Sequence, residues 1–310
     1  MSETRFGAML ARMAASLLLP LAFSAQAVAE PDAKLAIIID DIGYNLSLGR
    51  RTAVLKGAYT LALLPLTPHS RELATFAHTQ GKELILHAPM ANQRGLPLGP
   101  GALELGMPRD ELLNNLRHSL MTLPEVVGVN NHMGSALTEH AQPMGWIMGE
   151  LERRDLFFVD SRTTSASVAG EVAKSYGLRN AERDVFLDHV RDPEHIRQQL
   201  VRAIELARQR GSAIAIGHPY PETLEVLEQA GNLLAGQSVR LVSVSQLTRQ
   251  ALAGSGSCPL APNSLRDYRP PNRYFPVVLA NSRWWSWGNL INWRYQPAVI
   301  LDKHGISKSG

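Results

Sequence analysis

Eight short apolar runs alternate with amphipathic stretches along most of this 310-residue chain. The runs are continuously apolar, which is typical of strands that are buried on both faces of a sheet. They cover residues 35–41, 59–65, 83–90, 126–133, 156–160, 185–188, 212–218 and 239–244. Because strands and helices alternate, we expect right-handed crossovers and a parallel sheet. Eight candidate strands favour an α/β fold with a distorted (β/α) barrel of seven to eight parallel strands over an open doubly wound sheet.

Helix signals occupy several of the stretches between these runs. Ser70 and Asp192 are candidate N-caps, and Pro108 and Pro221 fit the first turn of a helix. The four predicted helical stretches are 70–81, 108–120, 192–211 and 221–236. Each lies between two apolar runs, as the crossovers of a parallel barrel require.

The two ends of the chain are predicted to lie outside the barrel, which we expect over residues 30–252. Residues 1–29 combine two arginines, a short apolar run and a terminal Ala27-Val28-Ala29 that fits a signal-peptide cleavage site. We therefore expect a periplasmic or secreted mature chain without a membrane span; an uncleaved N-terminal anchor is the alternative. Residues 253–310 are rich in Pro, Gly and Ser and hold four of the five tryptophans, which predicts a partly disordered tail.

The charge and cysteine content argue against two classes of protein. There are 31 basic and 28 acidic residues and no dominant basic cluster, so the composition gives no support to nucleic-acid binding. The chain has one cysteine, Cys258, so an intramolecular disulfide is impossible.

Polar side chains gather where the predicted strands end. They are Asp40, Asp41, His87, Asn130, Asn131, His132, Asp160, Asp188, His189 and His218. The carboxyl ends of parallel barrel strands converge on one face, and converging titratable groups mark functional sites. Taken singly, a histidine there is more often a capped or surface residue, and an aspartate is more often the N-cap of the next helix; Asp160, for example, could cap the turn that follows it. The remaining histidines are expected at the surface: His69, His78, His118, His140, His195 and His304.

Two histidines and one carboxylate form a good ligand set for Zn²⁺ or a similar divalent ion, with positions left open for water and substrate. A catalytic site also needs a base for that water and an acid for the leaving group. Asp40 and Asp41 are neighbours, so on an ideal strand their side chains point in opposite directions. We expect the turn at Gly43 to bring both carboxylates to the site.

Five segments, in this order, resemble the divergent polysaccharide deacetylases, the YibQ-like branch of the NodB-type carbohydrate esterases. They are "IIIDDIG", "ELILHAPM", "NNHMGS", "FVDSRTT" and "AIAIGHPYPET", and the resemblance spans about residues 33–250. It implies a distorted (β/α) barrel and metal-dependent removal of acetyl groups from N-acetylated sugars. It also implies Asp40 as the base, Asp41 and His87 as metal ligands, and His218 as the general acid.

The chain departs from the family pattern at two points. The usual H-x-x-x-H motif has Ala91 as its second position, so we predict His132 as the replacement ligand. The usual R-x-P-Y/F segment is not recognisable. The predicted metal ligands are thus Asp41, His87 and His132, with Asp160 and Asp188 as candidate additional site residues.

Three interpretations of function follow from these residues. The chain could be a zinc-type deacetylase of cell-envelope glycan. The departures from the family pattern favour a second interpretation, in which the barrel binds glycan or a cell-wall partner without turnover. In the third, it is another metallohydrolase, acting on O-acetyl or phosphate esters.

Overall fold

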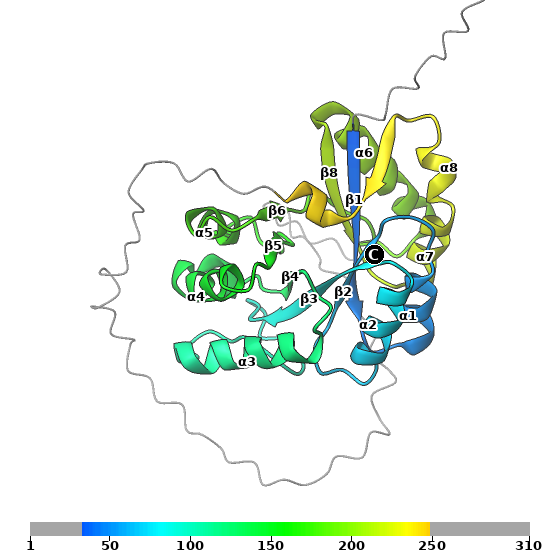
Figure 1. Ribbon diagram of the computed structural model, residues 1–310. Helices are drawn as coiled ribbons and strands as arrows, with labels where there is room; N and C mark the ends of the chain where they lie inside the picture. Colours follow the sequence, from blue (N-terminus) through cyan, green and yellow to red (C-terminus); the bar gives the residue numbers. More distant parts are fainter. Residues whose placement is uncertain (1–32, 249–310) are drawn as a thin grey trace, which may run out of the picture. The chain divides into compact units, whose positions relative to one another are not determined.

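The computed structural model describes residues 33–248, which form one nine-stranded sheet surrounded by helices (Figure 1). The predicted signal peptide, the predicted C-terminal tail and the predicted boundaries of the barrel fall outside the described residues and stay predictions. No helix among the described residues is long and apolar enough to cross a membrane.

All strand pairs in the sheet are parallel, which confirms the predicted parallel arrangement. The strands are β1 (Ala33–Ile42), β2 (Thr60–Leu63), β3 (Glu83–Met90), β4 (Gly128–Met133), β5 (Phe157–Asp160), β6 (Asn180–Glu182), β7 (Val185–Phe186), β8 (Ser212–Gly217) and β9 (Val239–Val242). Eight follow the order β6-β5-β4-β3-β2-β1-β8-β7, and β9 pairs with the start of β1. The sheet curls into a half-barrel, so the predicted distorted (β/α) barrel is confirmed.

The two strands at the ends of this order, β6 and β7, follow each other closely in the chain. Strand β6 pairs with β5 and β7 pairs with β8, yet only Arg183 and Asp184 separate β6 from β7. The Arg183 N–H donates to the Asp160 carbonyl, whereas the Asp184 N–H donates to the Ile214 carbonyl. The chain therefore crosses from one end of the sheet to the other within a few residues. The sequence did not predict β6, because its three residues, Asn-Ala-Glu, carry no apolar run.

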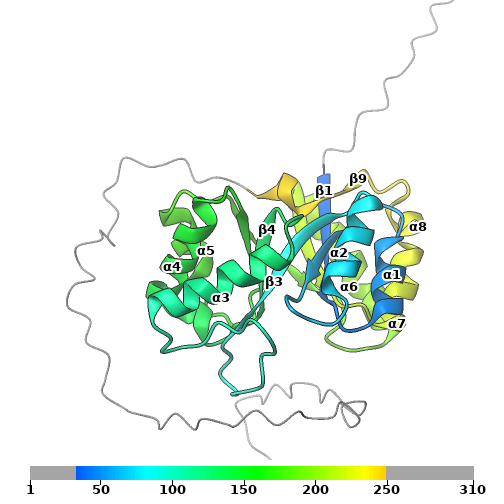
Figure 2. The same cartoon turned by 60° about the horizontal axis from the view of Figure 1, so that its bottom comes forward.

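The helices lie outside the curled sheet (Figures 1 and 2). They are α1 (Leu46–Ala53), α2 (Ser70–Thr79), α3 (Arg109–Thr122), α4 (Ala141–Glu152), α5 (Ala169–Ser175), α6 (Pro193–Arg210), α7 (Pro221–Glu228) and α8 (Ala230–Leu234), with 3₁₀ turns at Leu137–Glu139 and Val244–Leu247. The Asp192 side chain caps α6 by accepting from the His195 N–H at 2.9 Å, as predicted. The prediction for Ser70 was wrong: it is already inside α2, and its hydroxyl donates to the Leu64 carbonyl.

The sheet separates two apolar layers, which explains why the strand sequences are apolar without interruption. On β1, Leu35, Ile37 and Ile39 belong to the large outer layer, which also contains residues of the surrounding helices. Ala36 and Ile38 face the opposite way, into a small inner layer. Its buried members are Ala36, Ile38, Ala62, Ile85, Phe157, Val159, Ile214, Ile216, Val242 and Val244.

The inner face turns polar at the carboxyl ends of the strands. Counting on in steps of two from the inner residues leads to Asp40 on β1, to His87 on β3 and to His218 just after β8. The candidate site therefore lies in the barrel interior at the carboxyl ends of the strands.

Candidate active site

A bulge in β1 brings both neighbouring carboxylates to the same site. Ile39 pairs with Leu61 and Ile42 with Leu63, so Asp40 and Asp41 together oppose a single residue of β2. Asp41 has a left-handed backbone with φ +58°. An ideal strand would point the Asp41 side chain toward the helices, and the extra residue reverses this. We had expected the turn at Gly43 to do so; that expectation was wrong, because the reversal occurs two residues earlier.

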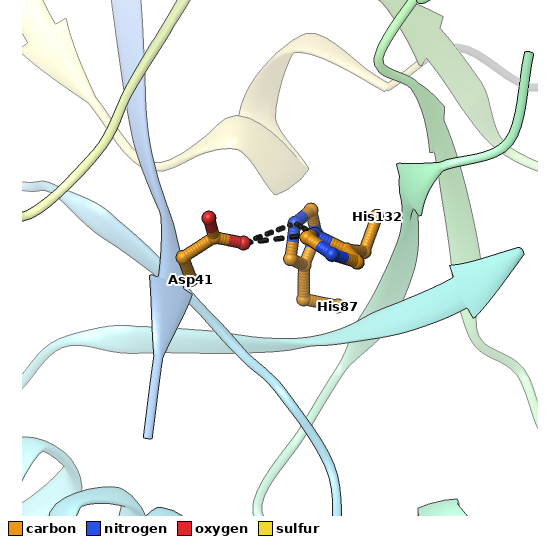
Figure 3. A group of neighbouring side chains, drawn as sticks. All are labelled: Asp41, His87 and His132. Atoms are coloured by element: carbon orange, nitrogen blue, oxygen red, sulfur yellow. Dashed lines mark hydrogen bonds and ion pairs between the residues drawn. The ribbon is translucent and has the colours of Figure 1, made fainter. Parts of the chain in front are cut away.

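Three side chains from three strands meet in front of the bulge (Figure 3). Asp41 Oδ1 lies 2.9 Å from His132 Nδ1 and 3.2 Å from His87 Nε2, and the two imidazole nitrogens are 3.1 Å apart. Among the described residues, this is the one group of three or more potential ligands with donor atoms close enough to share an ion. His132 comes from β4, next to the strand that carries His87.

The donor atoms of this cluster fit a divalent ion. Asp41 Oδ1 is buried, yet no described group gives it a well-aligned hydrogen bond, although two imidazole nitrogens lie within 3.2 Å. A buried carboxylate oxygen without a donor is costly, and a shared cation relieves that cost. One carboxylate and two imidazoles are also the donor types that zinc prefers. Ala91 has no ligand atom, and its backbone N–H donates to the Leu103 carbonyl.

Asn130 connects the base candidate with a ligand candidate. It lies directly opposite His87 in the β3–β4 register and is fully buried. Its Nδ2 donates to Asp40 Oδ1 at 2.8 Å, and its Oδ1 lies 2.8 Å from His87 Nδ1. The sequence places Asn130 at a strand end but predicts no role for it. Its place two residues before His132, on the same face of β4, was the signal that could have identified it.

His218 is held by a buried carboxylate on the other side of the site. Its Nδ1 lies 2.9 Å from Asp188 Oδ1, and its backbone N–H donates to Asp188 Oδ2 at 2.6 Å. The Thr223 hydroxyl donates to the same oxygen at 2.7 Å. The free Nε2 of His218 lies 3.8 Å from Asp41 Oδ2. Asp188 thus fixes the ring so that Nε2 faces the cluster.

The two neighbouring carboxyl groups differ in proton affinity. Burial raises the pKa of Asp40 above its ordinary value, even though His87, His218 and Asn130 oppose this. Burial would raise the pKa of Asp41 as well, but the nearby imidazoles of His132 and His87 outweigh it and hold that pKa well below the usual range. A proton is therefore favoured on Asp40 over Asp41.

The imidazole of His218 holds its proton more tightly than an ordinary histidine does. Burial alone would lower its pKa, but the hydrogen bond to Asp188 and the charge of Asp41 outweigh burial and raise the pKa to about 9. A histidine in this state can donate a proton from Nε2.

Asp160 does not join the site. Phe157 and Val159 of the same strand face inward, so Asp160 faces outward. Its carboxylate accepts from the Arg162 N–H at 2.8 Å and from the Ser167 hydroxyl at 2.6 Å, which shapes the following loop. The candidate pair Asp160 and Asp188 is therefore divided: Asp188 contacts His218, and Asp160 has the capping role considered for it.

The other histidines lie away from the cluster. His78, His118 and His140 are exposed, as expected, whereas His69 and His195 are half-buried. His195 packs edge-on against the exposed His189, with ring centroids 4.5 Å apart. His304 lies outside the described residues.

Comparisons with known proteins agree with this architecture. The model of the family described as "Divergent polysaccharide deacetylase" matches residues 37–248. The chain is 39% identical over 250 residues to the uncharacterized protein YibQ of Escherichia coli, covering 81% of this chain and 77% of that protein. It is 38% identical over 216 residues to an uncharacterized protein of Haemophilus influenzae, covering 70% and 77% of the two chains.

A crystal structure of an uncharacterized protein from Agrobacterium tumefaciens shares the fold. Its TM-score is 0.67 at 22% identity, covering 70% of this chain and 89% of that one. The family match spans the strands that carry Asp40, His87, His132 and His218. The chain therefore belongs to the divergent polysaccharide deacetylase family.

Proposed function

We propose that this protein is a metal-dependent hydrolase that removes acetyl groups from N-acetylated cell-envelope glycan. The observation that carries the proposal is the meeting of Asp41, His87 and His132 within 3.2 Å, beside Asp40 and His218, whose pKa values are both raised. Membership of the divergent polysaccharide deacetylase family supports an acetylated carbohydrate as the substrate class.

Asp41 Oδ1, His87 Nε2 and His132 Nδ1 would hold the ion, for which Zn²⁺ is the best candidate by donor type. When bound, such an ion supplies a Lewis acid that polarises the acetyl carbonyl and makes water more acidic. The side chains of this protein would supply the remaining steps, which are proton transfers and orientation.

Asp40 takes the proton from the attacking water, because it is the carboxylate with the raised pKa and it lies 3.7 Å from His87 Nε2, beside the cluster. His218 donates its Nε2 proton to the amide nitrogen as the C–N bond breaks, which releases acetate and a free amine. Asp188 stabilises the imidazolium before this transfer and keeps Nε2 directed at the site.

The proposed location is the periplasm or the exterior of the cell. The N-terminal sequence supports it, because basic residues, an apolar run and an A-x-A site follow one another there. Fractionation of cells that express the full chain, with the mature N-terminus sequenced, tests this: we expect cleavage after Ala29.

Acetate release from N-acetylated chitooligosaccharide and from peptidoglycan tests the activity directly. We expect zinc-dependent release by the wild-type protein and a loss of about 10²- to 10⁴-fold in Asp40→Asn, with zinc content unchanged. If the protein binds glycan but wild type and Asp40→Asn are equally inert, it is a glycan-binding module. If it hydrolyses only acetyl or phosphate esters in a substrate panel, it is another metallohydrolase.

A further inference from the structure

The amide of Asn130 lies between the proposed base and a proposed metal ligand. Its side chain is fully buried and touches three partners: Asp40 Oδ1 and His87 Nδ1, both at 2.8 Å, and the Ser161 hydroxyl at 3.3 Å. We propose that Asn130 is a positioning residue that fixes which nitrogen of His87 faces the metal cluster while it holds the carboxylate of Asp40. The inference rests on the proposed metal site.

The direction of each hydrogen bond follows from chemistry. An ionised Asp40 carboxylate can only accept, so the Asn130 atom beside it must be the NH₂ group. The other hydrogen of that NH₂ group points to the Ser161 hydroxyl. The amide oxygen therefore faces His87, and it can only accept from an Nδ1–H.

This tautomer is the one that a metal ligand needs. With the proton on Nδ1, the lone pair of His87 lies on Nε2, which faces Asp41 Oδ1 at 3.2 Å and His132 Nδ1 at 3.1 Å. Partners of this kind behind metal-bound histidines orient the ring and fix its tautomer. Asn130 does this with the same amide that orients Asp40, so it couples the geometry of the base to that of the ligand.

Asn131 provides a matched control on the same strand. It is also buried, but its side chain faces the other way: Oδ1 accepts from the Ser161 N–H at 2.9 Å and Nδ2 donates to the Met133 carbonyl at 2.7 Å. Among the described residues, Asn131 forms no hydrogen bond with Asp40 or His87. Leucine is close to asparagine in shape, so replacing either asparagine by leucine removes one buried amide with little change in the outline of the side chain.

Zinc affinity, measured by competition with a chromogenic chelator, separates the two asparagines. We expect Asn130→Leu to weaken zinc binding about 10- to 100-fold and Asn131→Leu to stay within about threefold of wild type, even if both variants melt earlier. Asn130→Asp keeps an oxygen that accepts from His87 Nδ1–H, although it also sets a second carboxylate against Asp40, so we expect it to lose less zinc affinity than Asn130→Leu. Wild-type affinity in Asn130→Leu would overturn the inference, as would equal losses in Asn130→Asp and Asn130→Leu.

A measurement on wild-type protein covers the case in which Asn130→Leu does not fold. In zinc-loaded protein with ¹⁵N-labelled histidine, we expect His87 to show a protonated, hydrogen-bonded Nδ1 and a metal-bound Nε2. Protonation on Nε2 would overturn the inference. Neither readout uses turnover, so an inert enzyme that binds zinc leaves this inference standing, whereas wild-type protein that binds no zinc refutes the metal site itself.

Discussion

Two groups of buried charge in this protein are built in opposite ways. The Glu150 cluster, formed by Glu150 with Arg117, Arg153 and Arg154, joins α3 to α4. Both oxygens of Glu150 accept from guanidinium groups at 2.5–3.0 Å, and these bonds lower the pKa of Glu150 to about 2, although burial opposes this. Its charge is therefore fully compensated by the protein itself.

In the cluster of Asp41, His87 and His132, the negative charge of Asp41 is not compensated in this way. Asp41 Oδ1 is buried without a well-aligned donor, and the two nearest imidazole nitrogens converge on it rather than on separate partners. A structural cluster pairs every lone pair, whereas a binding site keeps several directed at one point. Burial of charge alone therefore does not predict a site, and the proposed one is supported by the convergence of Asp41, His87 and His132.

The strongest test of this contrast removes one converging nitrogen. We expect His132→Ala to lower zinc affinity at least ~100-fold and to reduce acetate release in proportion, because only two of the three proposed protein ligands remain. Metal analysis after gel filtration measures the loss. His140→Ala, which changes an exposed histidine, is the control and should bind zinc normally. Full zinc retention by His132→Ala would remove it from the ligand set.

A second test weakens the support of the acid rather than the metal cluster. Asp188→Asn removes the negative charge that helps to raise the pKa of His218, so the imidazolium loses its proton at lower pH. We expect the basic limb of the pH–rate profile to move down by about one unit or more. The control is Asp160→Asn, which changes a buried carboxylate that faces away from the site. If the basic limb does not move in Asp188→Asn, Asp188 does not control the pKa of the proposed acid, His218.

A third test addresses the Glu150 cluster. The pKa of Glu150 is lowered in the folded state, so its stabilisation is present above about pH 4.5 and is lost as the pH falls toward 2. Glu150→Gln should cost about 1–2 kcal/mol of unfolding free energy at neutral pH, less than the shift alone implies because the arginines are partly exposed. Urea unfolding at pH 7 and pH 2.5 measures both values. Zinc affinity should not change, and a loss of it would contradict the division between the clusters.

The smallest expected effect comes from one exposed arm of the same cluster. The Arg153 side chain is 52% exposed, and Glu150 keeps two other guanidinium partners when it is removed. We expect Arg153→Ala to change the unfolding free energy by at most ~0.5 kcal/mol. A loss as large as that of Glu150→Gln would show that the cluster works as one cooperative unit.

The sequence predicted the parallel barrel and the strand ends that carry the site, because long apolar runs between helices leave few alternatives. It did not tell which face each polar residue would take. The strands are apolar on both faces, so alternation of polarity gives no cue. Asp160 and Asp188 therefore looked alike, and only the positions of Phe157 and Val159 in the inner layer show that Asp160 faces outward.

Three further features depend on contacts across the sheet. The proposed role of Asn130 depends on its position opposite His87, and neither strand sequence alone predicts that register. The left-handed backbone at Asp41 is equally hidden, because the residue is not a glycine and nothing in its neighbours marks it. The short β6 escaped because its three residues pair at one edge of the sheet without an apolar run.

The bulge in β1 also limits how the gene can change. Two residues there oppose one residue of β2, so deleting either aspartate codon would restore a regular ladder with a single acidic residue left on the strand. Inserting a codon would move Ile42 to the other face of the sheet and shift the register in which β1 pairs with β2. Substitutions can therefore be tested here one residue at a time. We expect insertion variants to be lost from a library selected for folding, and deletion variants to fold but to lack one of the two carboxylates of the proposed site.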